Sequence, residues 1–244
     1  MNIPTVNLGV IGGSGLYKID GLENVREISL ETPFGKPSDT ITIGRIGNTD
    51  IAFLPRHARG HVLMPTEIPN QANIYAMKLL GVERIISISA VGSLREAIRP
   101  LDLVIPDQLI DRTSLRDNTF FGKGLTAHIS FADPFCTELS TLLAQSGRNT
   151  TATIHEGGTC IVMEGPAFST KAESQLYRSW GADIIGMTAL PEAKLAREAE
   201  ICYSMLACVT DYDVWHESES TVTVDMIVAN LFKNVAVAQQ VLLD

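Results

Sequence analysis

The chain has 244 residues, 45% of them hydrophobic, a length that suffices for one large core. The formal net charge of −9 argues against nucleic acid as a partner, because phosphate backbones bind to basic surfaces. A small anionic ligand is compatible with this charge, since local donors can outweigh the net charge within a site. No repeat, linker or low-complexity tract divides the sequence, so it predicts a single domain over residues 1–244.

Neither a targeting segment nor a membrane span is visible. The first ten residues contain no basic region, and no apolar run is long enough to cross a bilayer. The four cysteines form no C-x-x-C pair and lie in apolar or mixed segments: Cys136, Cys160, Cys202 and Cys208. We therefore interpret them as reduced core residues of a cytoplasmic protein, in preference to disulfides.

Short β-rich runs alternate with helical patterns along the chain. The runs predict strands over residues 8–11, 84–90, 159–163, 182–185 and 202–210. Residues 40–46 and 49–55 flank Gly47-Asn48 and predict an antiparallel hairpin. This alternation is typical of a largely parallel sheet covered by helices on both faces. We therefore expect an α/β fold with a mixed central sheet flanked by helices.

Four helices have recognisable ends. We expect them over residues 70–80 before Gly81, after Asp133-Pro134, after a capping box of Thr170 and Glu173, and from the N-cap Thr223 to Leu242. The last of these is amphipathic and is expected to pack on the sheet.

The first predicted strand runs into a glycine-rich turn, VIGGSGLYKIDGL. The dinucleotide fingerprint fails because Lys18 stands where its third glycine is required, and no Gly-Lys-Ser/Thr ending marks a Walker-type loop. Gly12, Gly13 and Gly15 leave amides accessible around the Ser14 hydroxyl. Taken alone, this pattern fits a phosphate cradle and a bare structural turn equally well.

Polar residues follow several predicted strands, at the sheet edge where α/β folds bind ligands. Those that suit a tetrahedral oxyanion are Ser14, Arg56, His57, Ser89 and Thr188. Each has a simpler alternative. Thr188 could cap the next helix, Ser89 could be a small core residue, and Arg56 could form a surface ion pair.

Asp211 and Asp213 follow the strand at 202–210. In an extended segment, side chains two positions apart point to the same side, so both carboxylates would face one ligand. A helix cap or a solvated loop is the alternative. Facing carboxylates repel each other, which raises the pKa of one of them. A protonated carboxyl beside an ionised one suits adenine, because N7 needs a donor and the exocyclic amine needs an acceptor. Hypoxanthine and guanine carry a carbonyl in place of that amine.

Two other site types are not supported. His57 and His61 stand four apart, but the segment lacks the glutamate of the zinc-protease motif and contains Gly60, so we expect no metal. A serine-hydrolase elbow fails because Leu16 stands where its last glycine is required.

Nine segments, in this order, resemble the methylthioadenosine phosphorylases of the trimeric purine nucleoside phosphorylase family: GVIGGSGLY, ETPFGKPSD, PRHARGH, QANIYAMKLLG, SAVGSLRE, DQLIDRT, MEGPAFSTKAES, GMTALPEAKLAREA and TDYDVW. The resemblance runs from about residue 9 to 228. It implies a homotrimer, sometimes doubled to a hexamer, and an enzyme without a cofactor. It also implies the reaction, in which inorganic phosphate as co-substrate attacks 5′-methylthioadenosine and releases adenine and 5-methylthioribose 1-phosphate, a step of purine and methionine salvage.

The resemblance further implies roles for individual residues. For phosphate these are Ser14, Arg56, His57, Ser89, Thr188 and, through its amide, Ala90. For the nucleoside they are Met187 at the ribose, Phe168 in the base pocket, Asp211 and Asp213 at the base, and Val224, Val228, His61 and His128 around the 5′ substituent. His128 would come from the neighbouring subunit. Ser169 and Val224 are the positions expected to set specificity.

Asp211 and Asp213 are the candidate catalytic residues, because negative charge develops on the departing purine. Asp211 would hold its proton near neutral pH, a rise of about three units in its pKa caused by burial and by Asp213. The alternative is that Asp211 stays ionised and accepts a hydrogen bond from N7 protonated by water. Gly186 stands where many purine phosphorylases carry asparagine, which favours adenine over a 6-oxopurine.

Other functions stay open. A phosphorylase of inosine, guanosine or methylthioinosine is the nearest, but a 5′ hydroxyl against Val224 and Val228 would lose about 1–3 kcal/mol. A hydrolytic nucleosidase is less expected, because its nucleophile is water and the predicted anion donors would bind nothing. A nucleoside-binding protein that has lost turnover is a further alternative. No expected catalytic or binding residue is missing from the sequence that would favour it.

Overall fold

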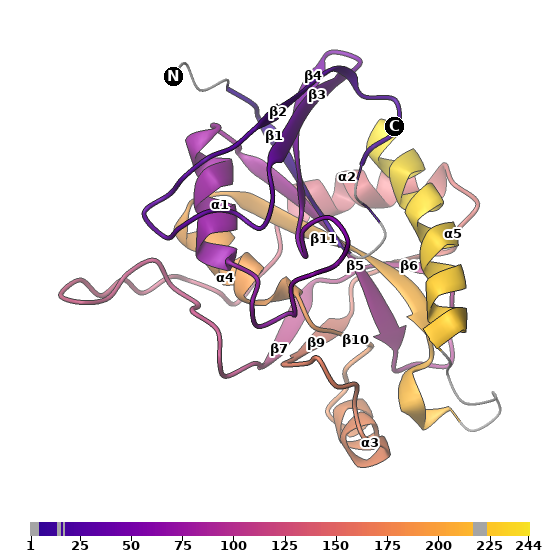
Figure 1. The fold of residues 1–244 in the computed structure, drawn as a ribbon. Helices are drawn as coiled ribbons and strands as arrows, with labels where there is room; N and C mark the ends of the chain where they lie inside the picture. Colours follow the sequence, from indigo (N-terminus) through magenta and orange to yellow (C-terminus); the bar gives the residue numbers. More distant parts are fainter. Residues whose placement is uncertain (1–4, 14–15, 17, 217–223) are drawn as a thin grey trace.

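The computed structural model describes residues 5–13, 16, 18–216 and 224–244. Within these residues one mixed sheet forms the centre of the molecule, with helices on both faces (Figure 1). Its strands are β1 (Leu8–Gly12), β2 (Glu23–Ile28), β3 (Ile41–Ile46), β4 (Thr49–Pro55), β5 (Arg84–Ser93), β6 (Leu103–Ile105), β7 (Gln108–Arg112), β8 (Ile154–Glu156), β9 (Thr159–Met163), β10 (Ile184–Gly186) and β11 (Cys202–Asp211). The helices are α1 (Asn70–Leu79), α2 (Thr137–Arg148), α3 (Lys171–Ser179), α4 (Ala189–Glu198) and α5 (Val224–Leu243), with a 3₁₀ turn, η1 (Asp213–Trp215).

The predicted fold class is confirmed. Every predicted strand is present, and β3 and β4 form the predicted antiparallel hairpin, in which Thr42 lies opposite Phe53. Four strands were not predicted: β2, β6, β7 and β8. β2 and β7 contain charged residues that are depleted in strands, and β6 and β8 have only three residues each. The order along the main path is β2-β3-β4-β1-β5-β10-β9-β7, and β11 pairs with β5 on its other side.

Two apolar layers lie on opposite faces of the sheet. α1 and α4 cover one face, and α2 and α5 cover the other (Figure 1). Successive strand residues alternate between the layers: Ile85 and Met205 face the first, whereas Ile86 and Leu206 face the second. The sheet is therefore covered on both sides, and its strand ends remain as the place for a polar site. No helix in the described part of the chain is both long and apolar enough to span a bilayer.

Two predicted helix ends are confirmed and one is wrong. Gly81 follows α1 with φ of +78°, and the capping box of Thr170 and Glu173 begins α3. Asp133 does not begin α2, which starts at Thr137. The extended Cys136 precedes it and donates its amide to the carbonyl of Tyr203, so the preceding segment follows β11 before a helix can form. The predicted cap Thr223 lies outside the described residues.

The interpretation of all four cysteines as reduced is wrong. Cys136 and Cys202 form a disulfide across a sequence separation of 66, whereas Cys160 and Cys208 are free and buried. The pairing depends on the packing of the segment before α2 against the first residue of β11. Local spacing of cysteines carries no information about such a contact.

Candidate active site

The sheet opens along one edge of β5. β1 pairs with β5 as far as Gly12 opposite Ile88, and β10 pairs with the same edge only from Gly92. In the described part of the chain no strand pairs with this edge at residues 89–91. The backbone of Ser89 and Ala90 is thus available to a ligand, between a parallel and an antiparallel neighbour.

Gly13 closes one side of this opening. A Cβ at Gly13 would lie 2.6 Å from the carbonyl oxygen of Ile88 and 3.0 Å from Nη1 of Arg56. The first distance is shorter than Cβ contacts allow and the second is tighter than most, so the backbone at residue 13 lies against β5 and Arg56 only because that residue is glycine. Ser14 lies outside the described residues, and its place at phosphate stays a prediction.

Arg56 is fully buried and does not form the surface ion pair considered above. Its Nε pairs with Glu192, and its Nη2 donates to Glu192 (3.2 Å) and Ser87 (2.6 Å). Nη1 donates to the carbonyl of Ile88 (3.1 Å), the residue opposite the end of β1. The Tyr203 hydroxyl donates to the same glutamate (2.9 Å). The guanidinium is thereby fixed with Nη1 toward the Gly13 turn, and Glu192 balances its charge.

His57 lies next to Arg56 as a neutral imidazole. Burial and the positive charge of Arg56 lower the pKa of His57 to about 4. Its Nδ1 lies 2.9 Å from the carbonyl oxygen of Leu63, and only a protonated Nδ1 can donate there. Nε2 is then the unprotonated nitrogen and can accept a hydrogen bond. The His61 ring stacks on His57 with the centroids 4.3 Å apart.

Thr188 precedes α4 but does not cap it. Its side chain makes no capping hydrogen bond, and its Oγ1 lies 3.2 Å from Oγ of Ser89. Met187 packs against Gly165, where a Cβ would lie only 2.7 Å from the methionine sulfur. Two residues predicted at phosphate, Ser89 and Thr188, therefore meet across the opening of the sheet.

Asp211 and Asp213 lie together, although not through an extended segment as predicted. The chain turns after Asp211, and Asp213 begins η1 with φ of +54°. Both aspartates border Gly92, where a Cβ would lie 3.2 Å from Oδ1 of Asp211 and 3.4 Å from Cβ of Asp213. Asp211 and Asp213 are therefore close together because of a turn, and not because they alternate along one strand as the sequence had suggested.

The two carboxyl groups differ in their hydrogen bonds. Asp211 accepts from the Asp213 amide (2.8 Å) and the Thr210 hydroxyl (2.7 Å), and Asp213 accepts from the Ser174 hydroxyl (2.5 Å). Burial raises the pKa of Asp211, and these two donors oppose the rise. Burial, and to a smaller extent the charge of Asp211, raise the pKa of Asp213 to about 6. We expected the charge of Asp213 to raise the pKa of Asp211. In the structure it is the charge of Asp211 that raises the pKa of Asp213.

The remaining predicted residues lie at the rim or elsewhere. Phe168 is 64% exposed, and the adjacent Ser169 is buried with its hydroxyl 3.7 Å from the sulfur of Met163. His128 belongs to the long connection between β7 and α2 and lines a hollow of about 410 Å³. Val224 and Val228 fall in the first turns of α5, where the side chains lie outside the described residues.

Three residues of the site were not predicted individually: Glu192, Ser174 and Arg116. Glu192 holds Arg56, Ser174 holds Asp213, and Arg116 contacts the backbone around Thr188. An acid in the apolar run TALPEAKLA was the available signal for Glu192, because a buried carboxylate requires a cationic partner. Among the described residues, no group of three or more His, Cys, Asp or Glu side chains is placed to hold a metal ion.

Comparison with known proteins agrees with this geometry. Residues 7–244 match the model of the phosphorylase superfamily. S-methyl-5′-thioadenosine phosphorylase from Gloeobacter violaceus is 59% identical over 99% of this chain and 82% of its own length. The corresponding enzyme from Geobacter sulfurreducens is 60% identical over 96% of this chain and 82% of its own.

Solved structures give the same result. A methylthioadenosine phosphorylase from an antarctic soil metagenomic library superposes with a TM-score of 0.94 at 52% identity, covering 98% of this chain and 84% of that one. A mutant adenosine/methylthioadenosine phosphorylase from Schistosoma mansoni, in complex with methylthioadenosine, has a TM-score of 0.92 at 36% identity, covering 98% and 90%. The chain belongs to the phosphorylase superfamily and, within it, to the family of the S-methyl-5′-thioadenosine phosphorylases.

Proposed function

We propose that this enzyme catalyses the phosphorolysis of 5′-methylthioadenosine to adenine and 5-methylthioribose 1-phosphate. One observation carries the proposal: the gap beside β5 has anion donors at Arg56, Ser89 and Thr188, and a pair of aspartates with raised pKa values at Gly92. The first group suits the attacking phosphate and the second suits the departing purine. No cofactor is needed for this reaction, because phosphate itself is the nucleophile.

The proposed reaction forms one bond and breaks one. A phosphate oxygen attacks C1′ of the ribose, and the bond from C1′ to N9 breaks with its electron pair going to the purine. The phosphate is oriented by Arg56, Ser89, Thr188 and the Ala90 amide. Nε2 of the neutral His57 accepts a hydrogen bond from the hydroxyl group of the phosphate. A protonated carboxyl of the Asp211/Asp213 pair donates to N7 as charge develops there, and the ionised one accepts from the exocyclic amine.

The pocket for the 5′ substituent is proposed to need a second subunit. His128 lies on a connection, residues 113–135, that projects from the body of the molecule (Figure 1) and exposes Leu115, Leu125 and Ile129. We propose a homotrimer in which this connection reaches the site of the neighbouring subunit. Met187 would contact the ribose, Phe168 the base, and His61, Val224 and Val228 the methylthio group.

The decisive experiment measures release of the purine base from 5′-methylthioadenosine with and without inorganic phosphate, beside adenosine, inosine and methylthioinosine. Phosphate-dependent release confined to the adenine compounds is the expected result. Release without phosphate would make the protein a hydrolase. Preference for the inosine compounds would mean that the aspartates face a 6-oxopurine, the second candidate.

A further inference from the structure

Arg116 lies at the start of the exposed 113–135 connection, yet its side chain is only 3% exposed. All five N–H groups of its guanidinium have acceptors. Nε donates to Oε1 of Glu164 (2.9 Å), and Nη2 donates to the carbonyls of Glu164 (2.6 Å) and Met163 (3.3 Å). Nη1 donates to the carbonyls of Met187 (2.5 Å) and Leu190 (2.7 Å). One side chain therefore joins the end of β9 to the segment from the end of β10 to the start of α4.

The carbonyls on Nη1 belong to irregular backbone. Leu190 has φ of −117° and ψ of 137°, as a residue before proline prefers, so the start of α4 is not helical. Met187 precedes the N-cap Thr188, so its carbonyl accepts no hydrogen bond from within α4. Arg116 supplies a donor to that carbonyl from outside the helix.

This irregular segment carries two residues of the proposed site. Thr188 lies between the two carbonyls, and its hydroxyl faces Ser89 in place of capping the helix. The side chain of Met187 packs on Gly165, whose preceding residue, Glu164, is held by Arg116 as well. The guanidinium thus holds residues 163–164 and residues 187–190 at the same time.

We propose that Arg116 is a positioning residue of the active site, which fixes the backbone of residues 187–190 so that Thr188 meets phosphate and Met187 meets the ribose. The inference rests on the proposed phosphorolysis. The proposed role requires the planar guanidinium. A lysine offers one ammonium group, which cannot reach the acceptors of residues 163–164 and those of residues 187–190 together.

The alternative is that Arg116 only anchors the connection. A second arginine separates the two roles: Arg197 on α4 donates to the carbonyls of Ser130 (2.8 Å) and Asp133 (2.5 Å), at the far end of the same connection. These contacts do not include residues 187–190. Arg197→Ala is therefore the matched control, since it loosens the connection and leaves the irregular segment alone.

The experiment first establishes phosphate-dependent adenine release by the wild-type enzyme, then compares Arg116→Lys, Arg116→Ala and Arg197→Ala. We expect kcat/KM for phosphate, measured at saturating methylthioadenosine, to fall about 100-fold in both Arg116 variants, as for a misplaced reacting group. It should stay close to wild type in Arg197→Ala, because the loosened connection acts on the nucleoside through His128 and not on phosphate. Millimolar guanidinium should restore activity to Arg116→Ala, and ammonium at equal ionic strength should not.

Wild-type activity in Arg116→Lys, or an equal loss in Arg197→Ala, would overturn the positioning role. Thermal stabilisation by inorganic phosphate gives a second readout that needs no turnover: present in wild type, lost in Arg116→Lys and kept in Arg197→Ala. A wild-type enzyme that phosphate stabilises but that does not cleave methylthioadenosine counts against the proposed substrate and leaves the test of Arg116 intact.

Discussion

Arg56 and Glu192 form an ion pair whose side chains are 0% and 1% exposed. Such a pair offers little net stability, but removing one partner leaves a buried charge without compensation. Its other effect is geometric, because Ser87 and Tyr203 fix the orientation of both groups. The arginine is thereby presented to the opening of the sheet in one orientation.

Replacing Glu192 with glutamine should destabilise the protein by about 3–5 kcal/mol, because the Arg56 charge stays buried. Chemical denaturation measures this loss. The control is Asp50→Asn, which removes the exposed partner of Arg45 and should leave the unfolding midpoint nearly unchanged. Equal effects of the two substitutions would contradict the buried charge balance.

Asp213 should make the protein less stable as the pH rises. Its pKa in the folded protein, about 6, lies above the ordinary value of 3.8, so the stabilising effect of its proton is complete below pH 3.8 and is lost as the pH rises through 6. Asp213→Asn carries no such titration. Relative to wild type it should gain up to roughly 3 kcal/mol between pH 4 and pH 8, measured as the difference in unfolding free energy. A constant difference across this range would exclude the raised pKa.

Ser174 should set the pH dependence of activity. Its hydroxyl lowers the pKa of Asp213, against burial and the charges of Asp211 and Glu173, which raise it. Ser174→Ala removes this opposing effect, so the inflection near pH 6 in the profile of kcat/KM should move to higher pH. Ser179→Ala, on the same helix with its hydroxyl on the Leu176 carbonyl, should leave the profile unchanged. A shift to lower pH in Ser174→Ala would contradict the assignment.

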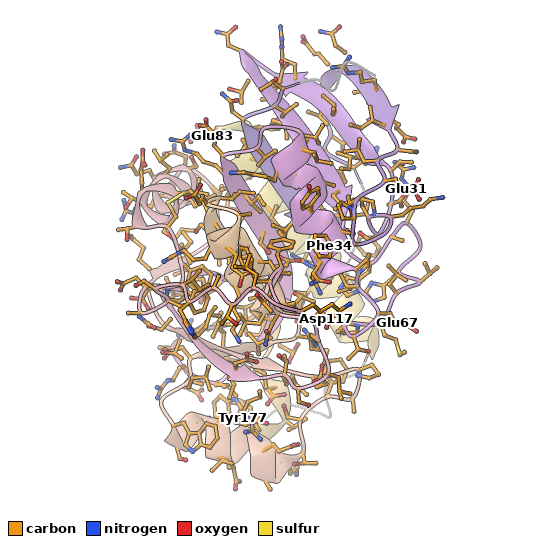
Figure 2. All side chains as sticks on the ribbon, turned by 90° about the vertical axis from the view of Figure 1, so that its left-hand side faces the viewer. Glu31, Phe34, Glu67, Glu83, Asp117 and Tyr177 are labelled. Carbon is orange, nitrogen blue, oxygen red and sulfur yellow. A yellow bond between two sulfur atoms is a disulfide. The ribbon has the colours of Figure 1, made fainter. Side chains whose placement is uncertain are left out.

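At the scale of elements, α3 and α5 hold the aspartate pair from two sides. α3 lies below the end of the sheet, where Tyr177 is labelled in Figure 2, and its Arg178 lies 3.4 Å from the ring centroid of Trp215 in η1. α5 packs along β11, and Asn230 donates to the Thr210 carbonyl (2.8 Å), next to Asp211. The turn that brings the carboxylates together is thus fixed by elements distant in sequence.

The disulfide joins two elements as well, because Cys136 precedes α2 and Cys202 begins β11. Titration of thiols in the unfolded, unreduced protein should detect the two free cysteines, Cys160 and Cys208. Reduction should lower the unfolding free energy by about 2–4 kcal/mol, since it removes a crosslink between distant residues. Detection of four thiols would restore the interpretation made from the sequence.

At the scale of the whole molecule, the sheet buries both faces under helices and leaves the 113–135 connection outside them. Figure 2 shows Phe34 and Asp117 on the same side of the molecule, and the rings of Phe34 and Phe120 lie 5.2 Å apart. Glu198 accepts from the Phe120 amide (2.6 Å), so α4 supports the connection from beneath. A projecting segment that is supported in this way and exposes apolar side chains is suited to contact a second copy of the chain.

Leu125, 60% exposed, tests the proposed trimer. Leu125→Glu should shift the mass measured by light scattering from trimer toward monomer, because the charge would have to be buried at the interface. The far-ultraviolet spectrum should not change. A wild-type monomer, or a trimer unaffected by this substitution, would contradict the proposed role of the connection.

The sequence by itself determined the fold class, the hairpin and the family. Alternating apolar runs specify strands through local periodicity, and long ordered motifs identify a family without any contact being known. It also determined which residue types stand at the strand ends, including Arg56, Ser89, Thr188 and the two aspartates.

Only the tertiary structure decided how these residues work. The Cys136–Cys202 disulfide, the pairing of Glu192 with Arg56, the hydrogen bond from Ser174 to Asp213 and the five contacts of Arg116 all join segments far apart in the chain. Burial and neighbouring charge, which set the pKa of His57 and Asp213, likewise arise only once the chain has packed. Periodicity reports the neighbours of a residue along the chain, whereas chemistry at the site depends on its neighbours in space.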